Sequence, residues 1–233
     1  MALADNRHAA LVAGFWSALP LDYALRIVGR GHLDVADAKT MPVPHNDHPL
    51  VSALLLRTLR LNCLTNAYAD LWLELYDPAW PQVDGWAGGW PALDPLGAVG
   101  PSWEPGIPLR TERERRAALV ELDALVAVWL GIGAEELVTL YLSRFPQLVD
   151  YESEMWFDAD GRRIAAKFDQ WGHGQTKEHY VQLMAYLEDP DGSPVPEGYR
   201  APFYKADREA EMRQAHEVFS ARLRAAVDAG WRP

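Results

Sequence analysis

The stretch from Leu50 to Tyr76 contains neither proline nor glycine, the two residues that most often end a helix. Proline lies directly before it, at Pro49, and directly after it, in Asp77-Pro78. The sequence therefore predicts one continuous helix over this stretch. A helix of this length and apolar content must pack against most of the domain, so it constrains the fold more than any other segment.

Two arginines share a face of this predicted helix with apolar side chains. Counting about 100° per residue places Arg57 and Arg60 in line with Leu61 and Leu64. Burying an unpaired guanidinium costs roughly several kcal/mol. We therefore expect the C-terminal half of the helix to be packed, and the half with the arginines to face either a phosphate backbone or carboxylates of the same chain. Cys63, among leucines, is interpreted as an inert packing thiol.

Helical patterns recur along most of the chain. The clearest helix starts at a capping box, Thr111-x-x-Glu114, and stops at Gly131. A hairpin is predicted around Asp158-Ala-Asp-Gly161, and an extended pattern, Leu33-x-Val35, predicts a strand. Further helices are expected at residues 7–18, 21–28, 134–145, 147–155, 177–189 and 208–230. The predicted fold class is mainly α with minor β.

An irregular arm interrupts the helices at residues 77–110. It holds seven of the 17 prolines and four of the ten tryptophans, namely Trp80, Trp86, Trp90 and Trp103. A loop of this length is uncommon in a compact domain and usually carries function. Either the arm binds a partner through its tryptophans, or the tryptophans pack on their own domain.

Length and composition set limits on the class of protein. A chain of 233 residues with 49% hydrophobic content can bury a core. It has no long apolar run and no secretory signal pattern, so a cytoplasmic location without membrane contact is expected. A formal net charge of −11 opposes binding to nucleic acid by this chain alone.

The residue types that carry catalysis do not form a convincing set. His45-x-x-His48 has metal-ligand spacing but lies between prolines, so a solvated loop is the better interpretation. His173, in a glycine-rich turn, is interpreted in the same way. No phosphate-binding glycine fingerprint and no pair of nucleophile and base can be named. We therefore expect no metal, no cofactor and no enzymatic activity in this chain itself.

Basic residues occur in small groups on this acidic background. Besides Arg57 and Arg60, the groups include Arg162 and Arg163 after the hairpin turn, and Arg26 and Arg30 near the N-terminus. Arginines at such positions can contact phosphates or base edges. Another group, at 113–116, is interpreted as ion-paired with neighbouring glutamates.

Several segments together resemble a known family. They are "FWSALPLDYALRIVGRGHLDVADAKTMPVP", "LRLNCLTNAYADLW", "PLRTERERRAALVELDALVAVWLGI", "FPQLVDYESEMWFDADGRRIA" and "PFYKADREAEMRQAHEVF". They are similar to the C-terminal target-recognition region of type IIG-like restriction-modification adenine DNA methyltransferases, including phage-defence methylases of actinobacteria. The resemblance covers about residues 10 to 224.

The motifs that such methyltransferases use for chemistry are missing from this chain. It has no glycine-rich turn for S-adenosylmethionine and no (Asn/Asp)-Pro-Pro-(Tyr/Phe) motif, because Asp77-Pro78, Asp94-Pro95 and Asp189-Pro190 each lack the second proline. The resemblance implies that S-adenosylmethionine binds a partner catalytic domain. It also implies that residues 1–49 are the edge of a target-recognition module, with apolar surface exposed, and that residues 50–233 form a helical C-terminal domain.

Two functional hypotheses follow. In the first, the chain is a non-catalytic target-recognition or accessory module that positions duplex DNA for a methyltransferase, with Arg26, Arg30, Arg57, Arg60, Arg162 and Arg163 as candidate DNA contacts. In the second, it is a protein docking module of a defence complex that makes no DNA contact, with Trp80, Trp86, Trp90 and Trp103 as candidate partner contacts.

Overall fold

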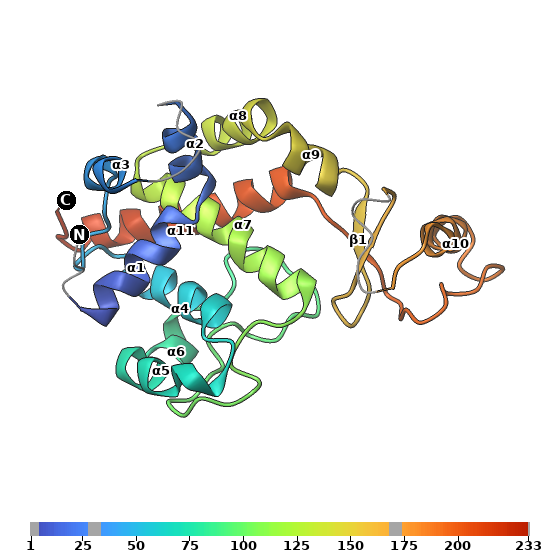
Figure 1. The fold of residues 1–233 in the computed structure, drawn as a ribbon, viewed down its shortest axis with the longest axis horizontal. Helices are drawn as coiled ribbons and strands as arrows, with labels where there is room; N and C mark the ends of the chain where they lie inside the picture. Colours follow the sequence, from blue (N-terminus) through green and yellow to red (C-terminus); the bar gives the residue numbers. More distant parts are fainter. Residues whose placement is uncertain (1–4, 28–33, 168–173, 233) are drawn as a thin grey trace.

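A computed structural model describes residues 5–27, 34–167 and 174–232, and it shows a helical body from which a smaller lobe projects (Figure 1). The fold is mainly α with minor β, as predicted. The body contains α1 (Asn6–Trp16), α2 (Leu19–Ile27), α3 (Val35–Thr40), α4 (Val51–Asn62), η1 (Asn66–Tyr68), α5 (Ala69–Leu75), α6 (Trp80–Val83), α7 (Glu112–Trp129), α8 (Ala134–Arg144), α9 (Pro146–Glu152) and α11 (Arg208–Asp228).

Helix α7 is the centre of the body, and it packs most extensively against α11. Its start is fixed by the predicted capping box: the Glu114 amide donates to Thr111 Oγ1 (3.2 Å), and the Thr111 amide donates to the Glu114 carboxylate (3.0 Å). Gly131 follows its end with φ +72°, a conformation that favours glycine. Asp207 caps α11 by accepting from the Ala210 amide.

The stretch from Leu50 to Tyr76 is not one helix, so that prediction is wrong. Helix α4 ends at Asn62, and η1 and α5 follow after a break at Cys63 and Leu64. Donors from distant segments satisfy the carbonyls at the break: Trp103 Nε1 donates to Cys63 O (2.8 Å) and Arg110 Nη2 to Leu64 O (3.1 Å). Tertiary contacts therefore stabilise this end of α4, which no proline or glycine marks in the sequence.

Burial along this stretch departs from the expectation in the N-terminal half, whereas the C-terminal half is packed through Trp72 and Leu75 as expected. Every residue of α4 from Ala53 to Leu61 is buried, including Arg57 and Arg60. Exposed apolar side chains occur instead after the break, at Leu64, Tyr68 and Leu73. Cys63 is buried, and burial raises the pKa of its thiol to about 11, as expected of an inert thiol.

The N-terminal helices share the core of the rest of the body. Leu11 and Phe15 of α1 belong to the same buried cluster as Leu54 of α4, so the core continues across residue 49. Val35 begins helix α3 rather than continuing a strand, Asp34 before it has no strand structure, and Leu33 lies outside the described residues. Ile27 and Val35 are exposed, which provides some of the apolar surface expected there.

The lobe, residues 155–205, carries the sheet and one further helix, α10 (Lys177–Glu188). The predicted hairpin is confirmed: β1 (Met155–Phe157) pairs antiparallel with β2 (Arg163–Ala165), with Trp156 opposite Ile164. Strand β3 (Tyr204–Lys205) pairs with the other edge of β1 and gives the order β2-β1-β3. Figure 1 shows α10 at the far end of the lobe, away from the body.

The hairpin turn is anchored to the start of α7. Asp158, fully buried, accepts from the amides of Asp160 (3.0 Å) and Arg162 (2.8 Å). The Arg113 amide of α7 donates to Gly161 O (3.2 Å). Gly161 has φ +75°, and a Cβ there would lie 2.7 Å from Thr111, so glycine is required for both reasons. The turn therefore has a fixed position relative to the body.

Candidate functional site

The two arginines of α4 are structural residues. Arg57 is 1% exposed, and its Nε (2.8 Å) and Nη2 (2.5 Å) both donate to Glu121 Oε2 of α7. Its Nη1 also donates to the carbonyl of Ala53, and its Nη2 to that of Gly85. The prediction that Arg57 contacts DNA is wrong, because its charge is already compensated inside the core by a carboxylate of the same chain.

Arg60 is also buried, and it binds backbone carbonyls instead of a carboxylate. Its Nε donates to Ile107 O and its Nη1 to Leu96 O, each at 2.7 Å. Burial lowers the pKa of Arg60, against an opposing contribution from Glu114. The prediction that Arg60 contacts DNA is therefore wrong: its guanidinium fixes two points of the arm.

The other carboxylate oxygen of Glu121 organises the tip of the arm. Glu121 Oε1 accepts from the amides of Ala87 and Gly88 and from Trp90 Nε1, each at 2.7 Å. With the two bonds from Arg57, this buried carboxylate accepts five hydrogen bonds. Such complete hydrogen bonding offsets the cost of burying the charge.

The predicted partner-binding tryptophans pack on their own domain. Trp80 is fully buried, so the prediction that it binds a partner is wrong. Trp86, Trp90 and Trp103 are partly buried against the main core, and their indole N–H groups donate to Asp94 O, Glu121 and Cys63 O. The arm is therefore a wrapping segment whose aromatic polar groups are satisfied within the chain.

The remaining predicted DNA contacts differ in exposure. Arg26 is exposed, and its nearest partner is Asp22, one turn earlier in α2 (2.9 Å). Arg30 lies outside the described residues. The side chain of Arg162 is 47% exposed and pairs with Asp158 (2.6 Å), whose hydrogen bond raises the pKa of the guanidinium. The side chain of Arg163 is 25% exposed, and its Nε lies 3.4 Å from Glu112.

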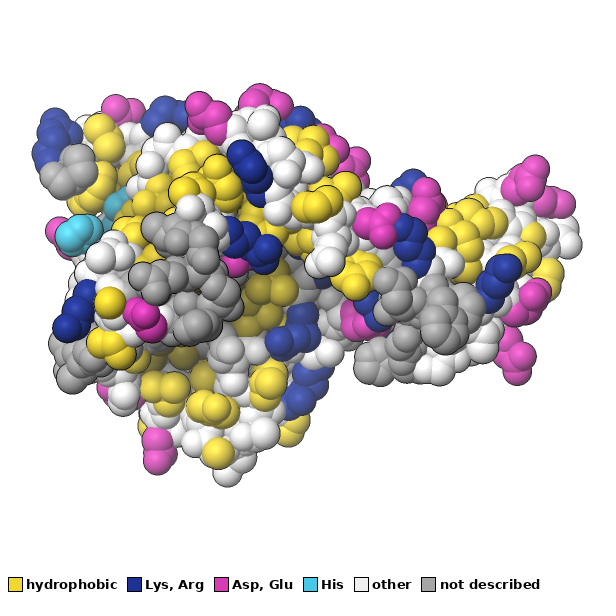
Figure 2. All heavy atoms as spheres, turned by 45° about the horizontal axis from the view of Figure 1, so that its top comes forward, with side chains coloured by type: hydrophobic (Ala, Val, Ile, Leu, Met, Phe, Trp, Pro, Cys, Tyr) yellow, Lys and Arg dark blue, Asp and Glu magenta, His cyan; other side chains and the backbone are white. Residues whose placement is uncertain are grey.

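A third exposed arginine lies near the hairpin turn. Arg200 Nη2 pairs with Asp160 at 2.7 Å, and the Arg200 amide donates to Asp158 Oδ2 at 3.2 Å. Around the hairpin turn, Arg162 and Arg200 are therefore exposed and Arg163 is partly exposed. We call these three residues the hairpin arginines. Figure 2 shows Lys and Arg side chains, in dark blue, on both sides of the waist between body and lobe, with acidic side chains among them.

A cavity of about 390 Å³ lies where the body meets the lobe, and we call it the junction cavity. Five separate segments line it: the tip of the arm, the first turns of α7, the end of strand β1, strand β3 with the residue before it, and the start of α11. Its lining includes Trp90, Arg113, Arg116, Tyr204, Lys205 and Gln214. The sequence indicated the basic group at 113–116 but assigned it to ion pairs with neighbouring glutamates.

An ionic network behind this cavity joins α7, α9 and α11. Arg208, buried, donates from Nη1 to Asp123 (2.6 Å) and from Nη2 to Glu152 (2.8 Å). Arg116 pairs with Glu152 and with Glu211, each at 2.6 Å. The carboxylates are therefore shared between arginines of different helices, which makes this network part of the body's packing.

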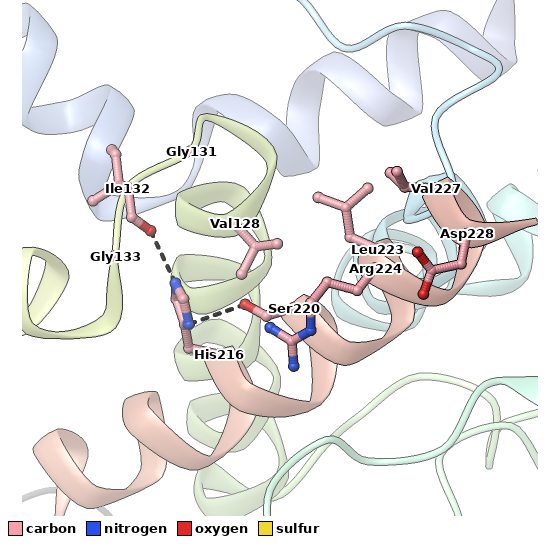
Figure 3. A pocket seen from close by; sticks show the side chains of 10 residues that line it. All are labelled: Val128, Gly131, Ile132, Gly133, His216, Ser220, Leu223, Arg224, Val227 and Asp228. Atoms are coloured by element: carbon pink, nitrogen blue, oxygen red, sulfur yellow. Dashed lines mark hydrogen bonds between the residues drawn. The ribbon is translucent and has the colours of Figure 1, made fainter. Parts of the chain in front are cut away.

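A second pocket, of about 440 Å³, contains a serine and a histidine on α11 (Figure 3). Ser220 Oγ lies 3.2 Å from His216 Nδ1, and His216 Nε2 lies 2.9 Å from Ile132 O. Since a carbonyl only accepts, Nε2 carries a proton, and in the neutral ring the Ser220 hydroxyl donates to Nδ1. This polarity would allow the imidazole to act as a base toward the serine.

The surroundings of this pair do not support nucleophilic catalysis. The neighbouring amides of Gly131, Ile132 and Gly133 all donate to acceptors of the chain, so none of them can stabilise an oxyanion. In Figure 3 the carboxylate of Asp228 lies at the opposite end of the pocket from His216. We interpret the pair as a contact that connects α11 to the segment between α7 and α8.

The third pocket contains a buried histidine. His48 stacks on Trp129 with 3.7 Å between ring centroids, and its Nδ1 accepts from the Leu50 amide (3.2 Å). Burial lowers the pKa of His48 to about 4. The interpretation of His48 as a solvated loop residue is wrong, because its ring belongs to an apolar groove of about 590 Å³ that also includes Phe15 and Trp231.

The described residues contain no group of three or more His, Cys, Asp and Glu side chains that could hold a metal ion. Among the helices that the structure describes, none combines the length and apolar character needed to cross a membrane. Comparison with known proteins gives no match to this chain, whether with family models, with curated proteins or with solved structures.

Proposed function

We propose that this chain is a non-catalytic accessory module that helps a partner adenine DNA methyltransferase hold duplex DNA. The observation that carries the proposal is the hairpin turn, which presents Arg162, Arg163 and Arg200 from a position fixed against α7. Arginines on a rigid turn suit phosphate contacts, because the side chains and the loop lose little conformational entropy on binding. The sequence resemblance supports the partner and the S-adenosylmethionine that the partner would bind.

The charge of the chain explains why such a module would depend on its partner. A formal net charge of −11 repels DNA at long range, and the hairpin arginines are partly compensated by Asp158, Asp160 and Glu112. The chain alone should therefore bind duplex DNA weakly. A cationic partner surface would supply most of the attraction, and the hairpin would add positioning.

The experiment measures binding to a fluorescent duplex by anisotropy over a series of salt concentrations, with and without the methyltransferase. Affinity should rise strongly when the methyltransferase is added. In the complex, Arg162→Ala/Arg200→Ala should weaken binding and reduce the slope of log K against log[salt] by about 2, since about two phosphate contacts are lost. The control Lys177→Ala/Arg224→Ala removes the same charge from exposed sites elsewhere.

Two results would contradict the proposal. One is tight binding of duplex by the isolated chain that does not change with salt. The other is equal binding by the hairpin variant and the control in the complex. Charge reversal at Arg57 and Arg60 cannot be used for this test, because both guanidinium groups are buried in the body.

The docking hypothesis is favoured by one observation, the apolar groove around Trp129, His48 and Trp231. A partner protein would bind there and leave the hairpin arginines free. The same assay distinguishes the two functions. Loss of DNA affinity in the hairpin variant with the assembly intact supports DNA positioning by the hairpin. Loss of the assembly in a Trp231→Ala variant supports docking.

A further inference from the structure

Arg113 of α7 is a buried cation without a carboxylate partner. The residue is 4% exposed, and no carboxylate of the described residues forms an ion pair with it. Its guanidinium lies over the ring of Tyr204, 3.6 Å from the centroid, and it lines the junction cavity. Burial lowers the pKa of Arg113, and the Tyr204 hydroxyl and, after it, the Glu211 carboxylate oppose that effect. The charge of this guanidinium is therefore only partly compensated within the chain.

The glutamates that could have neutralised Arg113 are engaged elsewhere. Glu114 binds Thr111 in the capping box, and Glu121 binds Arg57 and the arm. Glu211 lines the cavity, but it pairs with Arg116 and accepts from the Asp207 amide. Glu211 therefore compensates the positive charge of Arg113 only in part, without an ion pair, and the guanidinium can attract an anionic ligand.

Two further donors face the same cavity. Lys205 of β3 is exposed and lines the cavity; its Nζ lies 5.8 Å from the centre of the Trp156 ring and forms no ion pair with a described carboxylate. Gln214 uses its Oε1 to accept from the Gly89 amide (2.8 Å), which leaves its amide nitrogen as a donor. Arg116 adds a nearby charge, and its Nε has no hydrogen-bond partner among the described residues.

The carboxylates of the cavity leave a net positive lining. Asp207 caps α11 through Ala210, and Glu211 pairs with Arg116, which also pairs with Glu152 behind the cavity. Among the lining residues, the two carboxylates of Asp207 and Glu211 stand against the three cations of Arg113, Arg116 and Lys205, a formal excess of one positive charge. This excess occurs in a chain whose formal net charge is −11, so the cavity differs in sign from the molecule as a whole.

The rest of the lining is aromatic. Trp90, Phe157 and Phe203 line the cavity together with Tyr204. A volume of about 390 Å³ is in the range of small-molecule sites, in which apolar walls surround a few polar groups that fix orientation. The lining therefore suits a ligand that joins an oxyanion to a flat ring. The oxyanion would bind the cationic side chains, and the ring would lie against the aromatic ones.

We propose that the junction cavity binds a nucleotide: Arg113 and Lys205 hold its phosphate, Gln214 donates a further hydrogen bond, and the base lies against Trp90 and Phe203. The nucleotide comes either from the free pool or from the phosphorylated end of a DNA strand. This inference goes beyond the role in DNA positioning, because a free nucleotide satisfies it without any duplex.

The test is calorimetric titration of the whole chain with adenosine 5′-monophosphate, and with inorganic phosphate as the minimal ligand. Binding of the nucleotide should weaken about tenfold or more in Arg113→Met and in Lys205→Ala, which is a loss of about one phosphate contact in each case. Lys177→Ala, which removes an exposed lysine of the same lobe outside the cavity, should bind as the parent does. Lys205 is exposed, so its variant decides the question if the Arg113 variant does not fold.

Comparison of ligands identifies the source of the nucleotide. Binding of the monophosphate without binding of a 5′-phosphorylated single strand indicates the free pool, and binding of both indicates a strand end. No heat with any nucleotide at millimolar concentration would overturn the inference, as would equal affinities in Lys205→Ala and Lys177→Ala. If substitution of the hairpin arginines does not weaken duplex binding while the chain still binds the nucleotide, only the proposed function is overturned.

Discussion

Arg57 and Arg60 of α4 and Arg162 and Arg163 of the hairpin have the same appearance in the sequence: closely spaced arginines in an acidic chain. In the structure the first pair is buried and bound to Glu121 and to carbonyls of the arm, whereas the second pair lies at a partly exposed turn. The two pairs differ in the groups that the arginines contact, and not in the type of residue. Glu121 and the carbonyls of the arm enclose the first pair, whereas Asp158 and Glu112 pair with the second and leave it partly exposed to a ligand.

The largest effect that follows from this comparison is on stability, at Glu121. Glu121→Ala should lower the free energy of unfolding by about 3–5 kcal/mol, because it leaves Arg57 buried without a counter-charge. Arg57→Met/Glu121→Leu should cost clearly less than the sum of its single changes. Urea denaturation measures both. If the loss of stability in the double variant equals the sum of the losses in the two single variants, the two side chains are not coupled. The difference in role between the two arginine pairs would then not hold.

His48 extends the comparison to pH. Its pKa of about 4 in the folded protein is below the usual value of 6.5, so the unfolded chain binds a proton first. The stabilising contribution of the neutral ring is complete above pH 6.5 and decreases as the pH falls toward 4, by at most about 3 kcal/mol.

The measurement is urea denaturation between pH 7 and pH 4, followed by tryptophan fluorescence of the body. His48→Gln should be less stable than the parent at pH 7, and the gap between the two proteins should narrow toward pH 4. A gap that stays constant over this range would show that His48 is not the group responsible for the acid sensitivity.

Arg60 should show an intermediate effect. Arg60→Met removes two charge-assisted hydrogen bonds and leaves the carbonyls of Leu96 and Ile107 without these donors, at a cost of about 2 kcal/mol. The variant should also loosen the arm, so limited proteolysis within residues 91–108 should become faster. If cleavage accelerates while the free energy of unfolding is unchanged, the hydrogen bonds from Arg60 stabilise only the arm and not the rest of the body.

The smallest effect on stability is expected at the hairpin. Arg162→Ala removes a partly exposed ion pair with Asp158, which is worth at most about 1 kcal/mol. The same change should weaken duplex binding in the complex with the methyltransferase. A loss of stability as large as that at Glu121 would place Arg162 in the same structural class as Arg57 and remove the contrast.

The features that the sequence predicted correctly are those specified by neighbouring residues. The Thr111 and Glu114 capping box lies within one helical turn, and the Asp158 to Gly161 turn contains its own hydrogen-bonding groups. Both could be identified because backbone geometry and side-chain partner occur together in a few residues.

The features that were missed depend on long-range contacts. The end of α4 is stabilised by Trp103 and Arg110, and the charge of Arg57 by Glu121, with no local sign of either. The junction cavity combines five segments of the chain. Arg113 was assigned to neighbouring glutamates because the sequence does not show that Glu114 and Glu121 already have other partners.

The five hydrogen bonds to Glu121 also have a consequence for cooperativity. A segment rich in proline and glycine would ordinarily exchange its amide hydrogens quickly, as loops do. The amides of Ala87 and Gly88 instead donate to a buried carboxylate of the central helix, so they can open only when α7 separates from the arm. The tip of the arm should therefore exchange at the rate of the core helices and unfold in the same step.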